Sequence, residues 1–373
     1  MQKRLLTLEE ICEDIHEKPE DIGKFKRLTR NEGYYISNFR NGRGFTLEDT
    51  KVKAKLSFDG THQPTSIGYF KSKKGYNSKY KCSKVYANHI GEYVASIILK
   101  QLGKLACKVD LGYTTITNQY SGREIEIEGC LSHSQLGTHE MMLPACVAIE
   151  DYKTISPRKY RELTERGKTG SDKNYTNVEI ILAAFESKFR KNGQASRIPE
   201  MRKMFFDMCA FDLLFGNRDR HDENFGLKID QKTGEISFYH LFDDEQILGF
   251  QERKATVDLY LRNEAEYQKF KENELTSCIG IPGKTQQIHS TYLLKYLLEK
   301  YPREIIDSLN DIARYKITDL ENLLGRVENL SESHKNFAKK IFQDRHKEIF
   351  DIVAEYQKPK GKKTRYSDDE VSL

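Results

Sequence analysis

The pattern of hydrophobic and polar positions divides the chain into two parts of different texture. Between residues 34 and 127, short runs alternate hydrophobic and polar residues, as in "KVKAKLSF" and "TSIGYFK", which predicts β-strands. One helix is predicted among them at residues 84–103, where the apolar positions from Ile90 to Ile98 form a stripe. After Gly129 the apolar positions follow mainly helical spacing. The pattern therefore predicts an α+β fold with a small β-rich lobe and a larger, mainly helical lobe.

These textures indicate the domain organisation. Residues 1–30 are expected to form a helical extension, residues 31–129 the small lobe and residues 130–357 the large lobe. Residues 358–373 are a basic run followed by an acidic one and are expected to be a disordered tail. The polar stretch at residues 158–175 predicts a mobile loop. A cleft between two lobes is a usual place for a ligand.

Local signals predict where several helices begin and end. Thr7 with Glu10, and Thr176 with Glu179, have the spacing of capping boxes, which begin helices. A later helix that ends at Gly216 is apolar on most sides, which predicts that it is buried. A loop rich in charged residues follows this helix directly.

Composition and charge exclude some classes of protein. With 373 residues, of which 38% are hydrophobic, the chain can form a substantial core. A net charge of +5 from 61 basic and 56 acidic residues gives no reason to expect direct nucleic-acid binding. No apolar run approaches the roughly 20 residues that a membrane span needs, and the charged start is unlike a signal peptide. Seven cysteines without a C-x-x-C pair indicate reduced thiols, so we expect a cytoplasmic protein.

The charged loop "FGNRDRHDENFG" lies between the apolar helix and a predicted β-hairpin. Pairing Ile229 with Glu235 across that hairpin places Asn224 opposite His240, so that Asp243 returns beside Asn224. An asparagine and an aspartate offer the hard oxygen ligands that suit Mg²⁺.

A second carboxylate in this loop, Asp219, is not needed by the metal and could accept a proton from an attacking hydroxyl group. The spacing from Asp219 to Asn224 equals the Asp-to-Asn spacing of the protein-kinase signature H-R-D-L-x-x-x-N. Asp222 does not fit this spacing, because only Glu223 separates it from Asn224.

The motif Asn217-x-Asp219-x-His221-x-x-Asn224, followed by Asp243, resembles that of the HipA-like serine/threonine kinases. Its Asp-Arg-His core is also similar to the phosphatidylinositol 3/4-kinase pattern. These kinases have a small β-rich lobe and a larger helical lobe, with ATP and Mg²⁺ between them. The resemblance therefore implies the lobe order that the hydrophobic pattern predicts independently.

In the loop, the resemblance implies that Asp219 is the catalytic base and that Asn224 and Asp243 bind Mg²⁺. It implies that His221 polarises a phosphate or orients Asp219, although a role in holding the loop is an alternative. Asn217 and Arg220 are expected to be structural supports, and Asp244 is a further candidate metal ligand.

In the small lobe, the resemblance implies that Lys71 binds the ATP phosphates and that Glu92 holds Lys71. The alternatives are a solvated basic turn for Lys71 and an ordinary exposed helix carboxylate for Glu92. The hinge between the lobes is expected near Gly129 to Ser132. A Gly-rich phosphate loop is not clear, since only Gly42 and Gly44 are suitably spaced. The resemblance covers about residues 34–356.

The function expected from these residues is that of an ATP- and Mg²⁺-dependent serine/threonine kinase. It would transfer the γ-phosphate to a protein substrate and to itself. One alternative is a phosphoinositide or small-molecule kinase, and a second is a non-catalytic nucleotide-binding interaction module. A metal-dependent hydrolase built on Asp219, His221 and Asp222 is a third, although its ligands would be crowded into one short loop.

Overall fold

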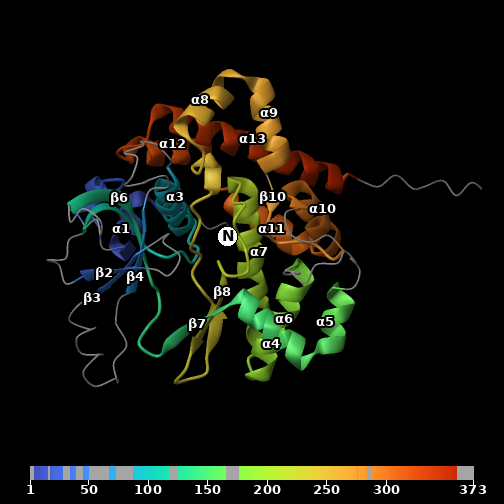
Figure 1. Ribbon diagram of the computed structural model, residues 1–373. Coiled ribbons are helices and arrows are strands. Elements are labelled where there is room, and N and C mark those ends of the chain that lie inside the picture. The colour runs from blue at the N-terminus through green and yellow to red at the C-terminus, as the bar shows by residue number, and fades with distance from the viewer. Residues whose placement is uncertain are drawn as a thin grey trace, which may run out of the picture.

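The computed structural model describes ten stretches of the chain and divides them into a sheet and a mainly helical part (Figure 1). The described residues are 4–15, 17–27, 34–38, 45–49, 67–72, 87–117, 124–164, 176–274, 276–283 and 288–358. Strands dominate the first part and helices the second, which confirms the predicted α+β class.

The sheet of the first part has six strands in the order β1-β5-β6-β4-β3-β2. Neighbouring strands are antiparallel except β1, which pairs with β5 in parallel. Helix α3 (Asn88–Gln101) packs on β5 and β6, and α1 (Leu8–Ile15) packs on α3. We call this sheet with α1 and α3 the small lobe. The strands are β1 (Lys26–Arg27), β2 (Tyr34–Asn38), β3 (Phe45–Asp49), β4 (Ile67–Ser72), β5 (Val109–Thr117) and β6 (Glu124–His133).

The predicted hinge at Gly129–Ser132 is wrong. These residues lie inside β6, where Gly129 pairs with Gly112 of β5 and Ser132 with Val109. The chain leaves the sheet only after His133 and reaches β7 (Glu140–Pro144) through residues 134–139. Glycine does not interrupt a strand whose backbone pairs on both sides, which is why the alternating pattern continues through it.

The large lobe is organised around α7 (Ile198–Phe215), which lies at the centre of the molecule (Figure 1). Its side chains from Phe205 to Phe215 are all buried, as the apolar sequence predicts, and it packs against α6, α11 and α13. Strands β7, β8 and β9 form a separate three-stranded sheet. Among the residues that the structure describes, no helix is long and apolar enough to cross a membrane.

The remaining elements lie in the following order along the chain. They are η1 (Pro19–Asp21), α4 (Ala145–Ile155), α5 (Pro157–Thr164), α6 (Val178–Lys191), η3 (Ala195–Arg197), β8 (Gly226–Asp230), β9 (Ile236–Phe238), η4 (Ile247–Gly249), α8 (Lys254–Arg262), α9 (Glu264–Glu274), β10 (Thr276–Ser277), β11 (Ile288–His289), α10 (Ser290–Lys300), α11 (Pro302–Ile312), α12 (Ile317–Arg326) and α13 (Glu332–Gln357).

The two predicted capping boxes have different outcomes. The first is confirmed, because Thr7 N–H donates to Glu10 Oε2 at 2.8 Å and Glu10 N–H donates to Thr7 Oγ1 at 3.2 Å. The second is wrong by one residue, because the cap of α6 is Asn177, whose side chain accepts from Ile180 N–H at 3.1 Å. Thr176 instead donates its hydroxyl to Asp222 of the charged loop, a tertiary contact.

The prediction of a loop at residues 158–175 is wrong for residues 158–164, because Pro157–Thr164 forms α5. Four further expectations lie outside the described residues: the strand predicted in "KVKAKLSF" at residues 51–58, the rest of that loop, the tail beyond Lys358, and the glycines Gly42 and Gly44.

A cluster of charged side chains joins residues 17–26 to the sheet. Lys26 Nζ lies 2.5 Å from Glu17 Oε1 and 3.5 Å from Asp110 Oδ1. Asp110 also contacts His133 Nε2 at 2.6 Å and Lys108 Nζ at 3.8 Å. Burial raises the pKa of Glu17 to about 7, and a hydrogen bond shared with Asp110 adds to this, while Lys26 opposes it. Glu17 thus titrates near neutral pH in the folded protein.

This cluster predicts that stability falls as pH rises from about 4.5 to about 7. The pKa of Glu17 is raised from 4.5, so the folded chain binds more protons than the unfolded chain across that interval. We expect Glu17→Gln to remove about 1–2 kcal/mol of the pH dependence of the free energy of unfolding. Urea denaturation at pH 5 and pH 8 measures it. An unchanged difference between the two pH values in Glu17→Gln would contradict the prediction.

Candidate active site

The charged loop begins where α7 ends. Gly216 adopts φ +69°, a left-handed conformation that glycine accepts without strain, and it terminates the helix. The next residue, Asn217, donates its N–H to the Asp212 carbonyl at 3.0 Å, which fastens the start of the loop to the last turn of α7. The loop then runs from Asn217 to Phe225 and enters β8.

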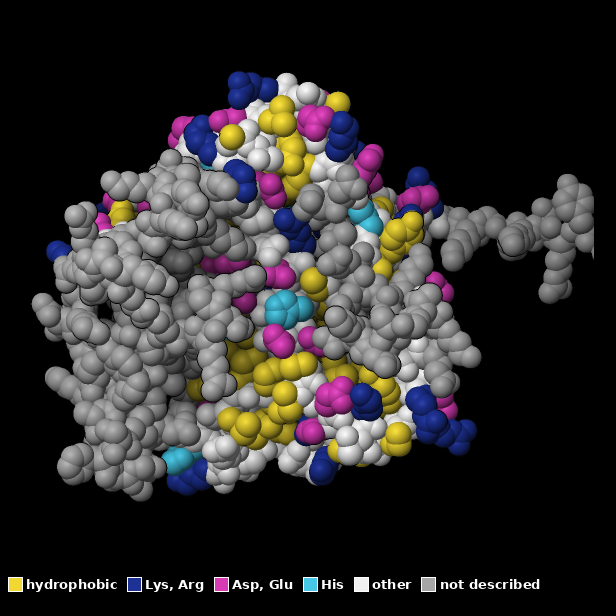
Figure 2. Space-filling view, in the orientation of Figure 1, with side chains coloured by type: hydrophobic (Ala, Val, Ile, Leu, Met, Phe, Trp, Pro, Cys, Tyr) yellow, Lys and Arg dark blue, Asp and Glu magenta, His cyan; other side chains and the backbone are white. Residues whose placement is uncertain are grey.

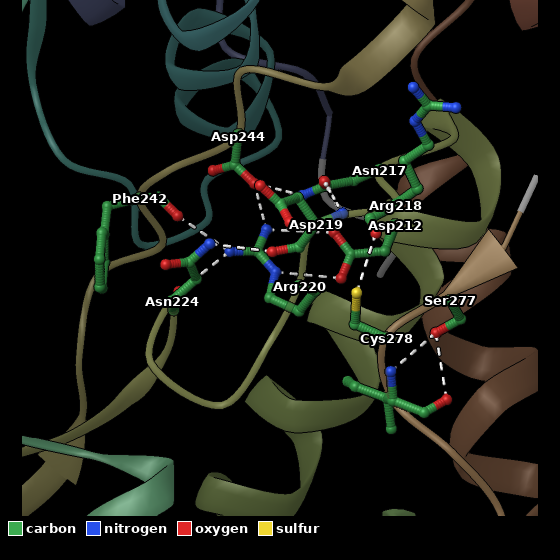
Figure 3. Close-up of polar contacts among 11 residues, drawn as sticks. Asp212, Asn217, Arg218, Asp219, Arg220, Asn224, Phe242, Asp244, Ser277 and Cys278 are labelled. Carbon is green, nitrogen blue, oxygen red and sulfur yellow. Dashed lines mark hydrogen bonds and ion pairs between the residues drawn. The ribbon is translucent and has the colours of Figure 1, made fainter. Parts of the chain in front are cut away.

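One buried arginine fastens the loop to its surroundings (Figure 3). Arg220 is 1% exposed, and its Nε and Nη2 atoms both donate to the Asp212 carboxylate at 3.1 Å. Nη2 also contacts Asp244 Oδ1. Nη1 donates to the backbone carbonyls of Asn224 at 3.2 Å and Phe242 at 3.0 Å. A single guanidinium therefore joins α7, the loop and the segment that follows β9.

The two carboxylates keep this arginine charged although it is buried. Burial by itself lowers the pKa of Arg220, but Asp212 and Asp244 raise it by more, so that it lies above its ordinary value. Burial raises the pKa of Asp244, and the nearby carboxylates Glu92 and Asp212 add to this, while Arg220 opposes them. Arg220 is thus the cation that offsets the burial of two carboxylates.

The hydrogen bonds of two residues of the motif confirm that these residues support the loop, as expected. Arg220 is one, and Asn217 is the other, because its Nδ2 donates to Asp244 Oδ1 at 2.9 Å and its Oδ1 accepts from Asp219 N–H at 3.1 Å. The first of these contacts uses the same oxygen of Asp244 that pairs with Arg220. Asp244 is therefore part of the anchor around Arg220, and its role as a further metal ligand stays a prediction.

Asp219 and Asn224 are held to each other and to the returning segment. Gln246 Nε2 donates to Asp219 Oδ2 at 2.6 Å, and Asn224 Nδ2 donates to the Asp219 carbonyl at 2.9 Å. Since the amide nitrogen of Asn224 is used in this way, its side-chain oxygen is the atom suited to face a cation. Asp219 is half-buried, whereas Asn224 is 4% exposed.

The backbone of Asp243 has φ +60°, a left-handed conformation that residues other than glycine rarely adopt. Its N–H donates to Glu92 Oε1 of α3 at 2.8 Å. Glu92 is 2% exposed, so the alternative of an ordinary exposed carboxylate is wrong. Lys71 lies on β4, where its backbone pairs with Cys130 of β6, but its side chain is outside the described structure. The pairing of Lys71 with Glu92 stays a prediction.

His221 and Asp222 face different surroundings. His221 is half-buried, and its Nδ1 accepts from Glu223 N–H at 3.3 Å. Asp222 turns toward the start of α6, where Thr176 Oγ1 donates to its Oδ2 at 2.5 Å. This contact engages one oxygen of the Asp222 carboxylate, and the hydrolase alternative stays untested. Figure 2 shows the face of the molecule that is also seen in Figure 1. Acidic side chains and a histidine gather at the middle of this face, next to an area of hydrophobic side chains.

The predicted register of the hairpin is wrong by one residue. Ile229 pairs with Ile236 rather than Glu235, because Asp230 also takes part in the pairing and donates its N–H to Glu235 O at 2.9 Å. The segment after β9 nevertheless returns beside the loop. The evidence is that Arg220 binds the backbone carbonyls of both Asn224 and Phe242.

Sequence reasoning missed two residues of the site, Gln246 and Asp212. Gln246 lies beyond the motif and gives no local signal, because its contact with Asp219 depends on the path of the returning segment. Asp212 had a usable signal. It is an acid within a helix that is apolar on most sides, and a buried carboxylate requires a cationic partner.

Comparisons with known proteins support a kinase fold. No family model matches the chain. Over 193 residues the chain is 25% identical to serine/threonine-protein kinase CtkA of Helicobacter pylori, covering 51% of this chain. The match spans 55% of that curated relative, about half its length. The crystal structure of a Helicobacter pylori proinflammatory kinase CtkA has a TM-score of 0.61 at 17% identity, covering 89% of this chain and 98% of that one.

A second solved structure is less similar. Shewanella oneidensis HipA, in a complex with HipB and operator DNA, covers 95% of this chain and 74% of its own, with a TM-score of 0.47 at 16% identity. The structural likeness to CtkA is the one that carries the fold. The chain therefore has the two-lobed fold of the kinase CtkA and shares sequence with it over half its length, which confirms its resemblance to the HipA-like serine/threonine kinases.

Proposed function

We propose that this chain is an ATP- and Mg²⁺-dependent kinase that transfers the γ-phosphate to a serine or threonine hydroxyl of a protein, including its own chain. The observation that carries the proposal is the arrangement around Arg220. It joins the loop bearing Asp219 and Asn224 to the segment bearing Asp243 through buried contacts. Similarity to a serine/threonine kinase supports the choice of reaction.

The residues present fit Mg²⁺. Asn224 and Asp243 would hold it, because both offer oxygen atoms and Mg²⁺ prefers few protein ligands together with waters and phosphate oxygens. Asp244, the neighbouring acid, is engaged by Arg220 and Asn217 and is left out of this set. When bound, the ion would neutralise charge on the β- and γ-phosphates.

Side chains of this protein would position the hydroxyl group and the phosphates for the reaction. Asp219 would accept the proton of the attacking hydroxyl, and Gln246 fixes the direction of its carboxylate. His221 accepts a hydrogen bond at Nδ1, so in the neutral ring Nε2 carries the proton and can donate to a phosphate oxygen. Lys71 on β4 would bind the α- and β-phosphates, and Glu92 would hold Lys71 as well as the Asp243 backbone.

The purified chain should be incubated with γ-labelled ATP, with and without Mg²⁺, alone or with casein or phosphoinositide vesicles. We expect Mg²⁺-dependent label on serine or threonine of the chain or of casein, and we expect Asp243→Asn to lose it. Label confined to lipid would overturn the proposed acceptor. ATP binding without transfer in every arm would overturn the catalytic proposal, as would labelling that survives Asp243→Asn and Asp219→Asn alike.

A further inference from the structure

Residues 17–27, which we call the interlobe strap, run along the edge of the small lobe. Strand β1 within the strap pairs with β5 in parallel. The Gly23 N–H donates to the Tyr93 hydroxyl of α3 at 2.7 Å. The ring of Phe25 lies 5.3 Å from the ring of Tyr113 on β5, measured between centroids. The strap is therefore bound to both the sheet and the helix of the small lobe.

The same residues bind the large lobe at the connection between α12 and α13. Glu328 N–H donates to Gly23 O at 2.9 Å, and Phe25 N–H donates to Glu328 Oε2 at 3.1 Å. Arg326 Nη1 donates to Pro19 O at 3.2 Å. The strap thus bridges two parts of the chain that are far apart in sequence.

Gly23 is one of the residues at which the two lobes meet. Its N–H binds α3, its carbonyl binds Glu328, and its φ of +82° is a conformation that favours glycine. A Cβ atom at this position would lie 2.5 Å from Arg326 O and 2.9 Å from Val327 Cα. Any other residue would have to push the strap away from the large lobe.

Helix α3 connects the strap to the candidate active site. Tyr93 is 2% exposed and follows Glu92 in the helix. Successive residues of a helix point ~100° apart, so Tyr93 can face the strap while Glu92 faces the Asp243 backbone. The start of α3 adds a contact on the site side, because Asn88 Nδ2 donates to Glu245 Oε2 at 3.1 Å.

The contacts form a closed circuit. From Asp243 it passes through Glu92 and α3 to Tyr93, then through Gly23 to Glu328 and α13. Helix α13 packs against η4, which follows Asp243 in the large lobe, and against α7. Such a circuit fixes the separation of α3 from the Asp243 segment, because moving α3 requires breaking contacts on both of its sides.

We propose that the interlobe strap sets the position of α3 against the Asp243 segment, with Gly23 and Tyr93 as positioning residues. The strap acts on the Asp243 segment through α3, which carries Glu92 and Asn88. The consequence for catalysis rests on the proposed function, whereas the structural role does not.

Hydrogen–deuterium exchange of the nucleotide-free chain tests the structural role. In Gly23→Ala and in Tyr93→Phe, which removes only the hydroxyl, we expect peptides covering α3 and residues 239–246 to exchange roughly tenfold faster. Peptides from α6 and α10 should exchange as in the unmodified chain. Exchange that is unchanged in residues 239–246, or that rises equally throughout the chain, would overturn the proposal.

Gly193→Ala is the matched control. Gly193 has a similar left-handed φ of +71°, but a Cβ atom there would meet nothing within 4 Å. This variant carries the same backbone strain without displacing the strap, so we expect the exchange of α3 and residues 239–246 to be unaffected. Equal acceleration in Gly23→Ala and Gly193→Ala would show general destabilisation and overturn the positioning role.

An activity measurement separates this inference from the proposed function. If the unmodified chain transfers phosphate, Gly23→Ala and Tyr93→Phe should each lower kcat/KM for ATP several-fold, and the double variant should lose less than the product of the two losses. Multiplicative losses would overturn a shared pathway through α3. If the unmodified chain transfers no phosphate, the proposed function fails, and the exchange measurement still decides the role of the strap.

Discussion

Replacing Asp219 with asparagine is expected to lower the rate of phosphoryl transfer by about 10²–10⁴-fold, the usual contribution of a positioned general base. Asparagine keeps the shape of the side chain and cannot accept the proton of the attacking hydroxyl. The loop should stay in place, because its anchor is Arg220 and because Asn224 binds the backbone carbonyl of residue 219 rather than its side chain. Single-turnover transfer from γ-labelled ATP measures the rate, and calorimetry should show ATP affinity close to that of the unmodified chain.

Asp222→Asn is the matched control for this prediction. Asp222 belongs to the same loop, but its side chain accepts from Thr176 Oγ1, and an asparagine oxygen can accept the same bond. We therefore expect this variant to transfer phosphate at a rate close to that of the unmodified chain. Similar losses in both variants would mean that loop integrity, not proton acceptance, had been measured.

Replacing Arg220 with methionine is expected to lower the free energy of unfolding by about 3–5 kcal/mol, the cost of removing one partner from a buried ion pair. The substitution leaves two buried carboxylates, Asp212 and Asp244, without their cation. It also removes the donor to the carbonyls of Asn224 and Phe242, so the two segments of the site lose their connection. Urea denaturation, monitored by circular dichroism, measures the change in the free energy of unfolding.

Arg345→Met tests whether the carboxylates cause that loss. Arg345 is also buried, at 2% exposure, and donates to Leu213 O and Ser290 Oγ at 2.8 Å. Within the described stretches Arg345 makes no ion pair; burial lowers its pKa to about 10, and the nearby charge of Glu348 opposes this. Its loss leaves only uncharged hydrogen-bond partners, Leu213 O and Ser290 Oγ, so we expect about 1–3 kcal/mol. A cost at Arg220 no larger than that at Arg345 would contradict the argument from charge.

Features that depend on neighbouring residues could be predicted from the sequence. The helix stop at Gly216 and the capping box at Thr7 follow from backbone and side-chain chemistry within one turn, and both are present. The spacing of hydrophobic residues identified α3, α7 and the α+β class, because a buried face places hydrophobic residues at regular intervals along the chain. The short motif from Asn217 to Asn224 indicated the kind of site because its residues are close in sequence.

Features that depend on pairing between distant segments were decided only by the tertiary structure. The register of the hairpin, the extent of β6 and the cap of α6 each changed by a few residues, because hydrogen bonds with another segment compete with local preference.

The candidate site shows the same division. The sequence indicated Asp219 as a candidate base and Asn224 and Asp243 as candidate metal ligands. The assignment of Asp244 to the Arg220 anchor, in contrast, depends on three segments meeting in a buried space. The path from Gly23 through α3 to Asp243 leaves no periodic signal, since its two hydrogen bonds, Gly23 to Tyr93 and Asp243 to Glu92, each join residues that are far apart in the chain. Local chemistry thus determined which groups are available, and long-range packing determined which of them anchor the site and which face it.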